Sequence, residues 1–141
     1  MRRLSDPSML AIVALLALGV MSASLDAVAC ERGRTPACAV VLKMHPHQKA
    51  IVAHGSVSGT KPDYYFSFAA KAKQAITITT HGGGLKTGPG IPLTLPDGTG
   101  DAVDEGTPYR LTQSGTYIVL LHANTMSEGP FGRFTMKLAI Q

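Results

Sequence analysis

The chain has 141 residues, a formal net charge of +4, 45% hydrophobic residues and only 6% aromatic residues. This length favours a single domain. The lysines and arginines are scattered, and no aromatic residues interleave with a basic stripe, so the pattern argues against nucleic-acid binding. The positive charge is compatible with acidic partners.

The N-terminus has the pattern of an export signal. Arg2 and Arg3 precede an uncharged apolar run over residues 9–21, and small residues follow it up to Ala29. Such a run is too short to span a bilayer but suits the h-region of a secretory signal. We therefore predict a cleaved signal peptide over residues 1–29 and a periplasmic or secreted mature protein that is not an integral membrane protein. An alternative is that Ala27 to Ala29 form a lipobox, with lipid attached to Cys30.

The N-terminal arm, residues 30–49, contains both cysteines of the chain, Cys30 and Cys38. Export places them in an oxidising compartment. Gly33 and Pro36 lie between them, so the segment can close a small loop. We expect a Cys30–Cys38 disulfide if no lipid is attached, followed by a first strand over residues 39–44.

The rest of the chain reads as short strands separated by polar turns. Residues 74–80 alternate isoleucine with threonine, and residues 133–140 alternate apolar and polar side chains, which indicates half-buried strands. Residues 116–123 are almost wholly apolar, so we expect a central strand there. The remaining strands are predicted at residues 51–58, 64–70, 91–96 and 109–111.

No helical periodicity follows the signal, so the pattern predicts an all-β protein. About eight strands at this spacing favour an antiparallel β-sandwich or jelly roll. Residues that share the apolar face of each strand should point into one interior. The expected core comprises Tyr64, Phe66, Phe68, Ile76, Ile78, Leu93, Leu95, Ile118, Leu120, Phe134, Met136 and Leu138.

The stretch "HGGGLKTGPG", residues 81–90, resembles two catalytic motifs and fits neither. A phosphate-binding loop needs glycine directly before Lys-Thr, where Leu85 stands, and a helix afterwards. An esterase oxyanion loop needs a nucleophile elbow, and Gly55 to Gly59 has valine in place of serine. We interpret the stretch as a surface loop that buries little, with Lys86 as its exposed cation.

Other polar clusters lack the spacing of known sites. His45 and His47 flank a proline in a turn, and no cluster has the spacing of a structural zinc site. The acidic stretch Asp97–Glu105 could ligate calcium but lacks the spacing of a calcium loop, so a polar turn is favoured. No group of residues forms a catalytic constellation. We therefore predict no enzyme activity, no cofactor and no metal.

The order of these segments resembles a known sandwich. "HGSVSGTKPDYYFSFAAKAKQAITITT", "LTLPDGTG", "LTQSGTYIVLLHA" and "GPFGRFTMKLAI" are similar to successive strands and turns of bacterial pre-peptidase C-terminal (PPC-like) domains. The resemblance covers residues 54–140 and implies a PPC-like β-sandwich domain over residues 50–141.

Among small exported proteins, the chain is also similar to periplasmic inhibitors of g-type lysozyme. Ser114, Gly115 and Tyr117 match the "S-G-x-Y" turn of those inhibitors. The resemblance implies an exported protein that binds a lysozyme. Lys86, Ser114, Gly115 and Tyr117 are then the candidate binding residues, although a buried Tyr117 at a sandwich corner is the favoured interpretation of that ring.

Two other functions stay open at this stage. One is a non-catalytic module that binds carbohydrate or the cell envelope, so that the partner is a glycan instead of a protein. The other, the least favoured, is a small hydrolase.

Overall fold

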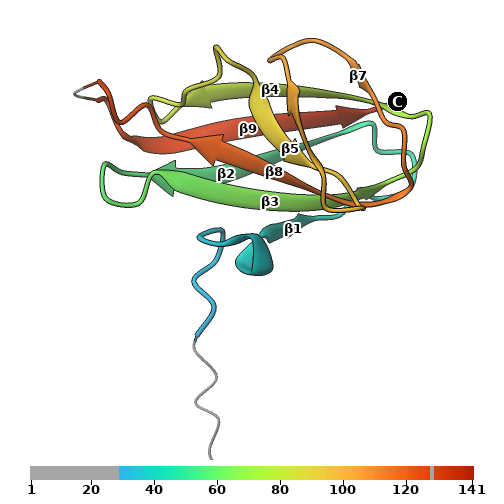
Figure 1. The fold of residues 1–141 in the computed structure, drawn as a ribbon, viewed down its shortest axis with the longest axis horizontal. Helices are drawn as coiled ribbons and strands as arrows, with labels where there is room; N and C mark the ends of the chain where they lie inside the picture. Colours follow the sequence, from blue (N-terminus) through green and yellow to red (C-terminus); the bar gives the residue numbers. More distant parts are fainter. Residues whose placement is uncertain (1–28, 128) are drawn as a thin grey trace, which may run out of the picture.

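The computed structural model describes residues 29–127 and 129–141. The expected signal peptide, apart from Ala29, lies outside the described residues. A short 3-10 helix, Pro36–Cys38, precedes nine described strands that form two sheets packed face to face (Figure 1). The strands are β1 (Val40–Leu42), β2 (Ala50–Val57), β3 (Asp63–Ala70), β4 (Ala75–Gly82), β5 (Ile91–Thr94), β6 (Gly100–Val103), β7 (Tyr109–Arg110), β8 (Gly115–His122) and β9 (Gly132–Ile140).

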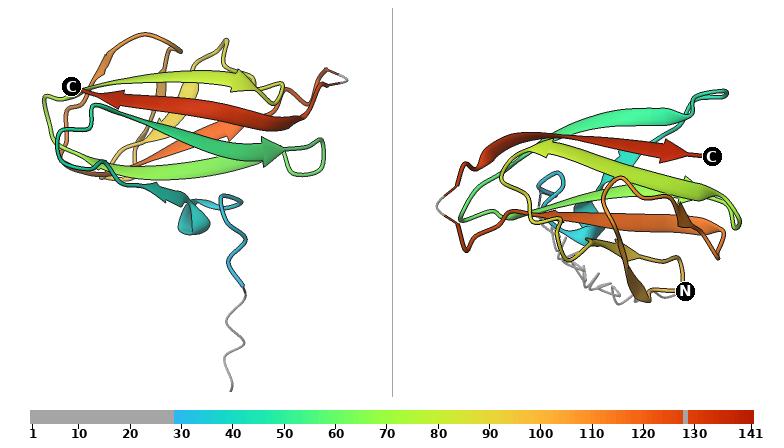
Figure 2. Two further views of the ribbon diagram at one scale, coloured as in Figure 1. Left: turned by 180° about the vertical axis from the view of Figure 1, so that it is seen from behind. Right: turned by 90° about the horizontal axis from the view of Figure 1, so that it is seen from above.

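This arrangement confirms the all-β sandwich. One sheet has the order β1-β3-β8-β5-β6 and the other has the order β2-β9-β4-β7. Figure 2 shows the two layers from behind and from above. All pairings are antiparallel except one, because β1 runs parallel to β3, with Val40 opposite Phe66. The sandwich is therefore antiparallel, as predicted, apart from this one edge pairing.

Strand β6 lies within a segment that the sequence predicted to be a polar loop. Only Val103 of this strand is buried, while Gly100, Asp101 and Ala102 are exposed. A four-residue edge strand with a single buried side chain shows no alternation in its sequence. The strand exists because its backbone pairs with β5, with Ile91 opposite Val103.

The core lies between the sheets and matches most of the predicted positions. Leu95 is only half-buried, at the margin of the core. Expected residues that are buried comprise Tyr64, Phe66, Phe68, Ile76, Ile78, Leu93, Phe134, Met136 and Leu138.

The prediction for β8 is wrong by one residue. Ile118 and Leu120 are half-buried on the outer face, whereas Tyr117, Val119 and Leu121 point inward and are at most 1% exposed. The strand lies in the middle of its sheet, as expected, and it is apolar on both faces. Its sequence therefore carries no alternation that would fix which residues face the interior.

The N-terminal arm contains the expected disulfide. Cys30 and Cys38 are bonded, with their Cα atoms 5.7 Å apart. The loop closes because Gly33 takes a positive φ of 77° and its N–H donates to the Cys38 carbonyl at 2.7 Å. A sulfur in this bond cannot also carry a thioether-linked lipid, so the disulfide and the lipid at Cys30 are mutually exclusive.

We expect the mature chain, isolated without reductant, to begin at Cys30 and to weigh two hydrogen atoms less than its reduced form. Intact-mass measurement before and after reduction checks this. A Cys30→Ser/Cys38→Ser variant is the control and should not change mass on reduction. Two free thiols in freshly isolated protein would contradict the disulfide, and an added acyl mass would identify the lipid form.

Candidate binding surfaces

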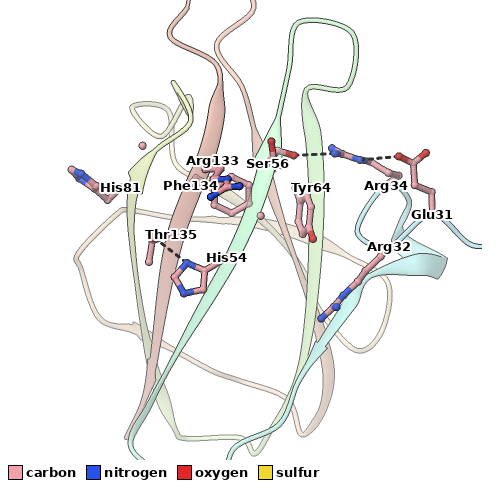
Figure 3. A pocket seen from close by; sticks show the side chains of 12 residues that line it. Glu31, Arg32, Arg34, His54, Ser56, Tyr64, His81, Arg133, Phe134 and Thr135 are labelled. Atoms are coloured by element: carbon pink, nitrogen blue, oxygen red, sulfur yellow. Dashed lines mark hydrogen bonds and ion pairs between the residues drawn. The ribbon is translucent and has the colours of Figure 1, made fainter.

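A hollow of about 820 Å³ opens where the outer face of the four-stranded sheet meets the N-terminal arm. Figure 3 shows polar and cationic side chains gathered around it. Its lining comes from the arm and from β2, β3, β4 and β9. The lining residues are Glu31, Arg32, Arg34, His54, Gly55, Ser56, Tyr64, His81, Gly82, Arg133, Phe134 and Thr135.

Strand register brings the two histidines of the hollow to one row. On β2, β9 and β4, His54, Thr135 and His81 are directly opposite one another. The Thr135 hydroxyl and His54 Nδ1 are 3.3 Å apart. Residues opposite each other share a face of the sheet. Because the inward neighbours on β9 are Phe134 and Met136, this row must face outward, and both imidazoles are exposed.

Arg34 lines the hollow on the side of the N-terminal arm. Its guanidinium donates to the Ser56 carbonyl on β2 at 3.0 Å and to the Asp63 carbonyl on β3 at 3.1 Å. It also lies 5.3 Å from the centre of the Tyr64 ring, within the range of a cation–π contact. Since β2 and β3 belong to different sheets, this one side chain joins the two layers at their open edge.

Glu31 is the only carboxylate among the lining residues, and it is paired. Lys61 Nζ is 2.6 Å from Glu31 Oε1, and Arg34 Nε is 3.6 Å from the same oxygen. The hydrogen bond from Lys61 lowers the pKa of Glu31, with the charge of Arg34 adding to the effect. The hollow therefore retains cationic character from Arg32 and Arg133.

Gly55 allows two of the aromatic rings that line the hollow to pack closely against β2. A Cβ at this position would overlap the ring of Phe134 and touch the ring of Tyr64. The glycine thus lets two large rings pack directly under the backbone of β2. The hollow ends on this aromatic floor.

Lys86 lies at one end of the sandwich, on the loop between β4 and β5. Its backbone N–H donates to the carbonyl of His122, the last residue of β8, at 2.7 Å. Asn124 N–H donates to the Gly84 carbonyl, and Ala123 N–H donates to the Pro62 carbonyl, each at 2.8 Å. These bonds tie together three loops, residues 58–62, 83–90 and 123–131 apart from residue 128, which we call the three-loop end.

The glycine run before Lys86 is more closely packed than expected. Gly82, Gly83 and Gly84 all have a positive φ, and a Cβ at Gly84 would come within 2.7 Å of the Pro130 carbonyl. Gly83 is buried and Leu85 is half-buried against the core. The expectation of a loop that buries little is therefore wrong for its first half, because β9 and the 123–131 loop cover it.

Ser114 and Gly115 lie at the opposite end from Lys86. Ser114 directly precedes β8 and Gly115 is its first residue. The backbone N–H of Lys86, in contrast, donates to the carbonyl of His122, the last residue of that strand. Seven strand residues of about 3.3 Å each separate the two ends by roughly 23 Å. The exposed Ser114 hydroxyl accepts a hydrogen bond from Ala72 N–H at 2.9 Å. The structure therefore does not bring the predicted binding residues together.

Tyr117 is part of the hydrophobic core and not of an exposed surface. Its ring is fully buried and stacks on Phe68, with ring centres 5.5 Å apart. Its hydroxyl donates to the Gln113 carbonyl at 2.5 Å and accepts from Gln113 N–H at 3.3 Å. This geometry matches a tyrosine corner and leaves no ring surface for a partner.

Three of the four carboxylates in the Asp97–Glu105 stretch, those of Asp97, Asp101 and Glu105, have separate protein partners. Hydrogen bonds from Thr99 lower the pKa of Asp97. The Tyr109 hydroxyl donates to Asp101 at 2.5 Å, and this bond raises the pKa of Tyr109 to about 12. Glu105 accepts from Thr80. The stretch begins with a hydrogen-bonded turn, as expected, and continues as the edge strand β6, which the polar-turn interpretation did not include.

Across residues 29–127 and 129–141, no three His, Cys, Asp or Glu side chains are grouped so as to hold a metal ion. Within the same residues, no helix has the length and apolar character needed to cross a bilayer. His45 and His47 lie in the exposed turn between β1 and β2.

The fold resembles solved lysozyme inhibitors. PliG from Aeromonas hydrophila, a periplasmic lysozyme inhibitor of g-type lysozyme, is 18% identical with a TM-score of 0.59, and the match covers 73% of this chain and 96% of that one. PliG from Salmonella Typhimurium is 14% identical, with a TM-score of 0.59 and coverages of 72% and 96%. A mutant of PliG from Escherichia coli is 17% identical, with a TM-score of 0.58 and the same coverages.

No protein-family model and no curated protein matches the sequence. The PPC-like assignment therefore stays a prediction. At these identities, the likeness to PliG establishes the sandwich fold over almost the whole length of those inhibitors. It does not by itself transfer their binding residues to this chain.

Proposed function

We propose that this protein is an exported, non-catalytic inhibitor that binds a g-type lysozyme in the periplasm or outside the cell. The observation that carries the proposal is the match of the sandwich to 96% of the length of PliG proteins described as periplasmic lysozyme inhibitors. The export-type N-terminus and the Cys30–Cys38 disulfide fit the same compartment.

The three-loop end is the surface best suited to enter an enzyme cleft. Loops on a rigid scaffold commonly carry binding function, and the hydrogen bonds from Ala123, Asn124 and Lys86 fix the base of these loops. Met126 is 91% exposed and offers an apolar contact, while Lys86 offers a cation. Glycoside hydrolases generally act through paired carboxylates, which a projecting cation complements.

The opposite end supplies the alternative contact surface. Ser114 and Gly115 are exposed there, and the Ser114 hydroxyl accepts a hydrogen bond from Ala72 N–H of the neighbouring β3–β4 turn. If the partner binds this end, substitutions at Lys86 will have no effect on affinity. The two surfaces are far enough apart for single substitutions to separate them.

The direct test is a turbidity assay with suspended cell walls and lysozymes of the g, c and i types. We expect the purified mature protein to slow clearing by the g-type enzyme and to leave the other two unaffected. The heat-denatured protein is the control for nonspecific effects. No inhibition of any lysozyme at a large molar excess would overturn the proposal.

We expect Lys86→Ala to weaken inhibition of the g-type enzyme and to make the remaining affinity less sensitive to salt, because one exposed cation is lost. Stability should change by less than about 0.5 kcal/mol, as is usual at exposed positions. Affinity at two salt concentrations and thermal unfolding measure the two effects. Ser114→Ala, at the other end, is the matched control. If Ser114→Ala weakens binding while Lys86→Ala does not, the contact lies at the Ser114 end.

A further inference from the structure

The outer face of the four-stranded sheet carries positive charge without any acidic side chain. The four strands β2, β9, β4 and β7 contain no aspartate or glutamate. Alternation along β9 turns Arg133 and Lys137 outward, since Phe134, Met136 and Leu138 are buried. Arg110 on β7 lies opposite Ala75, so it shares this outer face. We call this surface the basic face.

The cations of the basic face have neutral neighbours. Lys137 is opposite Val52 on β2 and Thr79 on β4, and Arg133 is opposite Ser56. Cross-strand positions are where opposite charges would normally pair. Without such partners, the potentials of the cations add over the surface. Arg133 and Lys137 are both exposed, and four strand residues place them about 13 Å apart.

The hollow extends the basic face at one end. Arg32 reaches it from the N-terminal arm, and Arg133 reaches it from β9 (Figure 3). His54 and His81 flank Thr135 there and add ring N–H groups as hydrogen-bond donors. The resulting surface joins the cations of β9 to a recess lined by hydrogen-bond donors and by one carboxylate, that of Glu31, which is paired with Lys61 and Arg34.

The chemistry of this face differs from that of a protein interface. The centre of a protein interface is depleted in charge and enriched in aromatic residues. Here the outward positions between the cations are small or β-branched, namely Thr77, Thr79, Thr135 and Ala139. No aromatic side chain points outward from β2, β4 or β9, so stacking of nucleic-acid bases has no platform.

We propose that the basic face binds an extended anionic polysaccharide. Successive carboxylate or sulfate groups along such a chain would pair with Arg133 and Lys137, and the end recess would take one sugar through Arg32 and the two histidines. The hydroxyls of Ser56 and Thr135 supply neutral hydrogen bonds to sugar hydroxyls. The site lies on the sheet face, and its end recess borders the three-loop end, where Lys61 pairs with Glu31. The proposal does not rest on lysozyme inhibition.

The test measures binding of the mature protein to fluorescently labelled polygalacturonate, dextran sulfate and neutral dextran at three salt concentrations. We expect both anionic polymers to bind at low salt and neutral dextran not to bind. The carboxylated and sulfated polymers distinguish which anionic group is preferred. Arg133→Gln/Lys137→Gln should lower affinity at least about tenfold and reduce the slope of log K against log salt by roughly one to two, because released counterions are fewer.

The matched control is Lys43→Gln/Lys71→Gln, which removes the same charge from exposed positions outside the four strands β2, β9, β4 and β7. Circular dichroism and thermal unfolding show that both variants are folded. Equal losses of affinity in the two variants would overturn the site, because net charge alone would then explain the binding. Binding of single-stranded DNA in preference to both polysaccharides, or no binding of either polysaccharide at low salt, would also overturn it.

Discussion

Replacing Phe134 by alanine should lower the free energy of unfolding by about 3–5 kcal/mol. The ring is 2% exposed and packs edge-on against Tyr64 and Phe66, with ring centres 5.3 and 6.1 Å apart. It also fills the space that Gly55 leaves under β2. Alanine would remove these contacts and leave a cavity where the two sheets meet. Urea unfolding followed by circular dichroism measures the change.

Phe134→Leu is the control for this prediction. It keeps most of the apolar volume and should cost clearly less than the alanine variant, since cores tolerate swaps of similar volume. A loss below about 1 kcal/mol for Phe134→Ala would mean that the three-ring cluster does not form in solution.

The second large effect is expected at β8, where neighbouring leucines face opposite ways. Leu121→Ala should cost about 2–5 kcal/mol, because this side chain is 1% exposed between the sheets. Leu120→Ala should cost about 1 kcal/mol, because Leu120 is only half-buried on the outer face opposite Tyr65. Chemical denaturation of the two variants under identical conditions compares them directly.

These two variants change the same residue type at adjacent positions, so composition and strand propensity cancel between them. Equal losses would show that both faces of β8 are covered in solution. A larger loss at Leu120 would restore the orientation expected from the sequence and contradict the structure.

The sequence predicts the strands best where one face is buried and the other is exposed to solvent. Strand β9 alternates Phe134, Met136 and Leu138 with polar residues, so both its existence and its inward face are readable. The same alternation predicts that Arg133 and Lys137 lie on one face of β9, which is part of the basic face. The sequence does not show that β2 and β4 are the neighbours of β9. It therefore cannot show that no aspartate or glutamate lies opposite these two cations.

Where a strand does not alternate apolar and polar residues, the sequence does not predict which of its faces points inward. Strand β8 is apolar on both faces, so Leu120 and Leu121 cannot be ordered from the sequence. The hollow was not predictable either. Arg32 and Arg133 line the same hollow only because the N-terminal arm packs on the edge of the sheet. Ser114 is a candidate because it matches a motif and Lys86 because it is the cation of a glycine-rich loop, and the length of β8 keeps the two apart.

The position of β9 has a consequence for the order in which the molecule can be made. It is the last strand of the chain, yet it lies between β2 and β4 and pairs with both along seven or more residues. Until residues 132–140 have been synthesised, β2 and β4 have no partner between them, and unpaired strand edges invite association with other chains. The hydrogen-bonded layer is therefore complete only when residues 132–140 are present. A chain that stops a few residues early would lose this layer rather than merely its end, so a C-terminal truncation should be far more damaging than its length suggests.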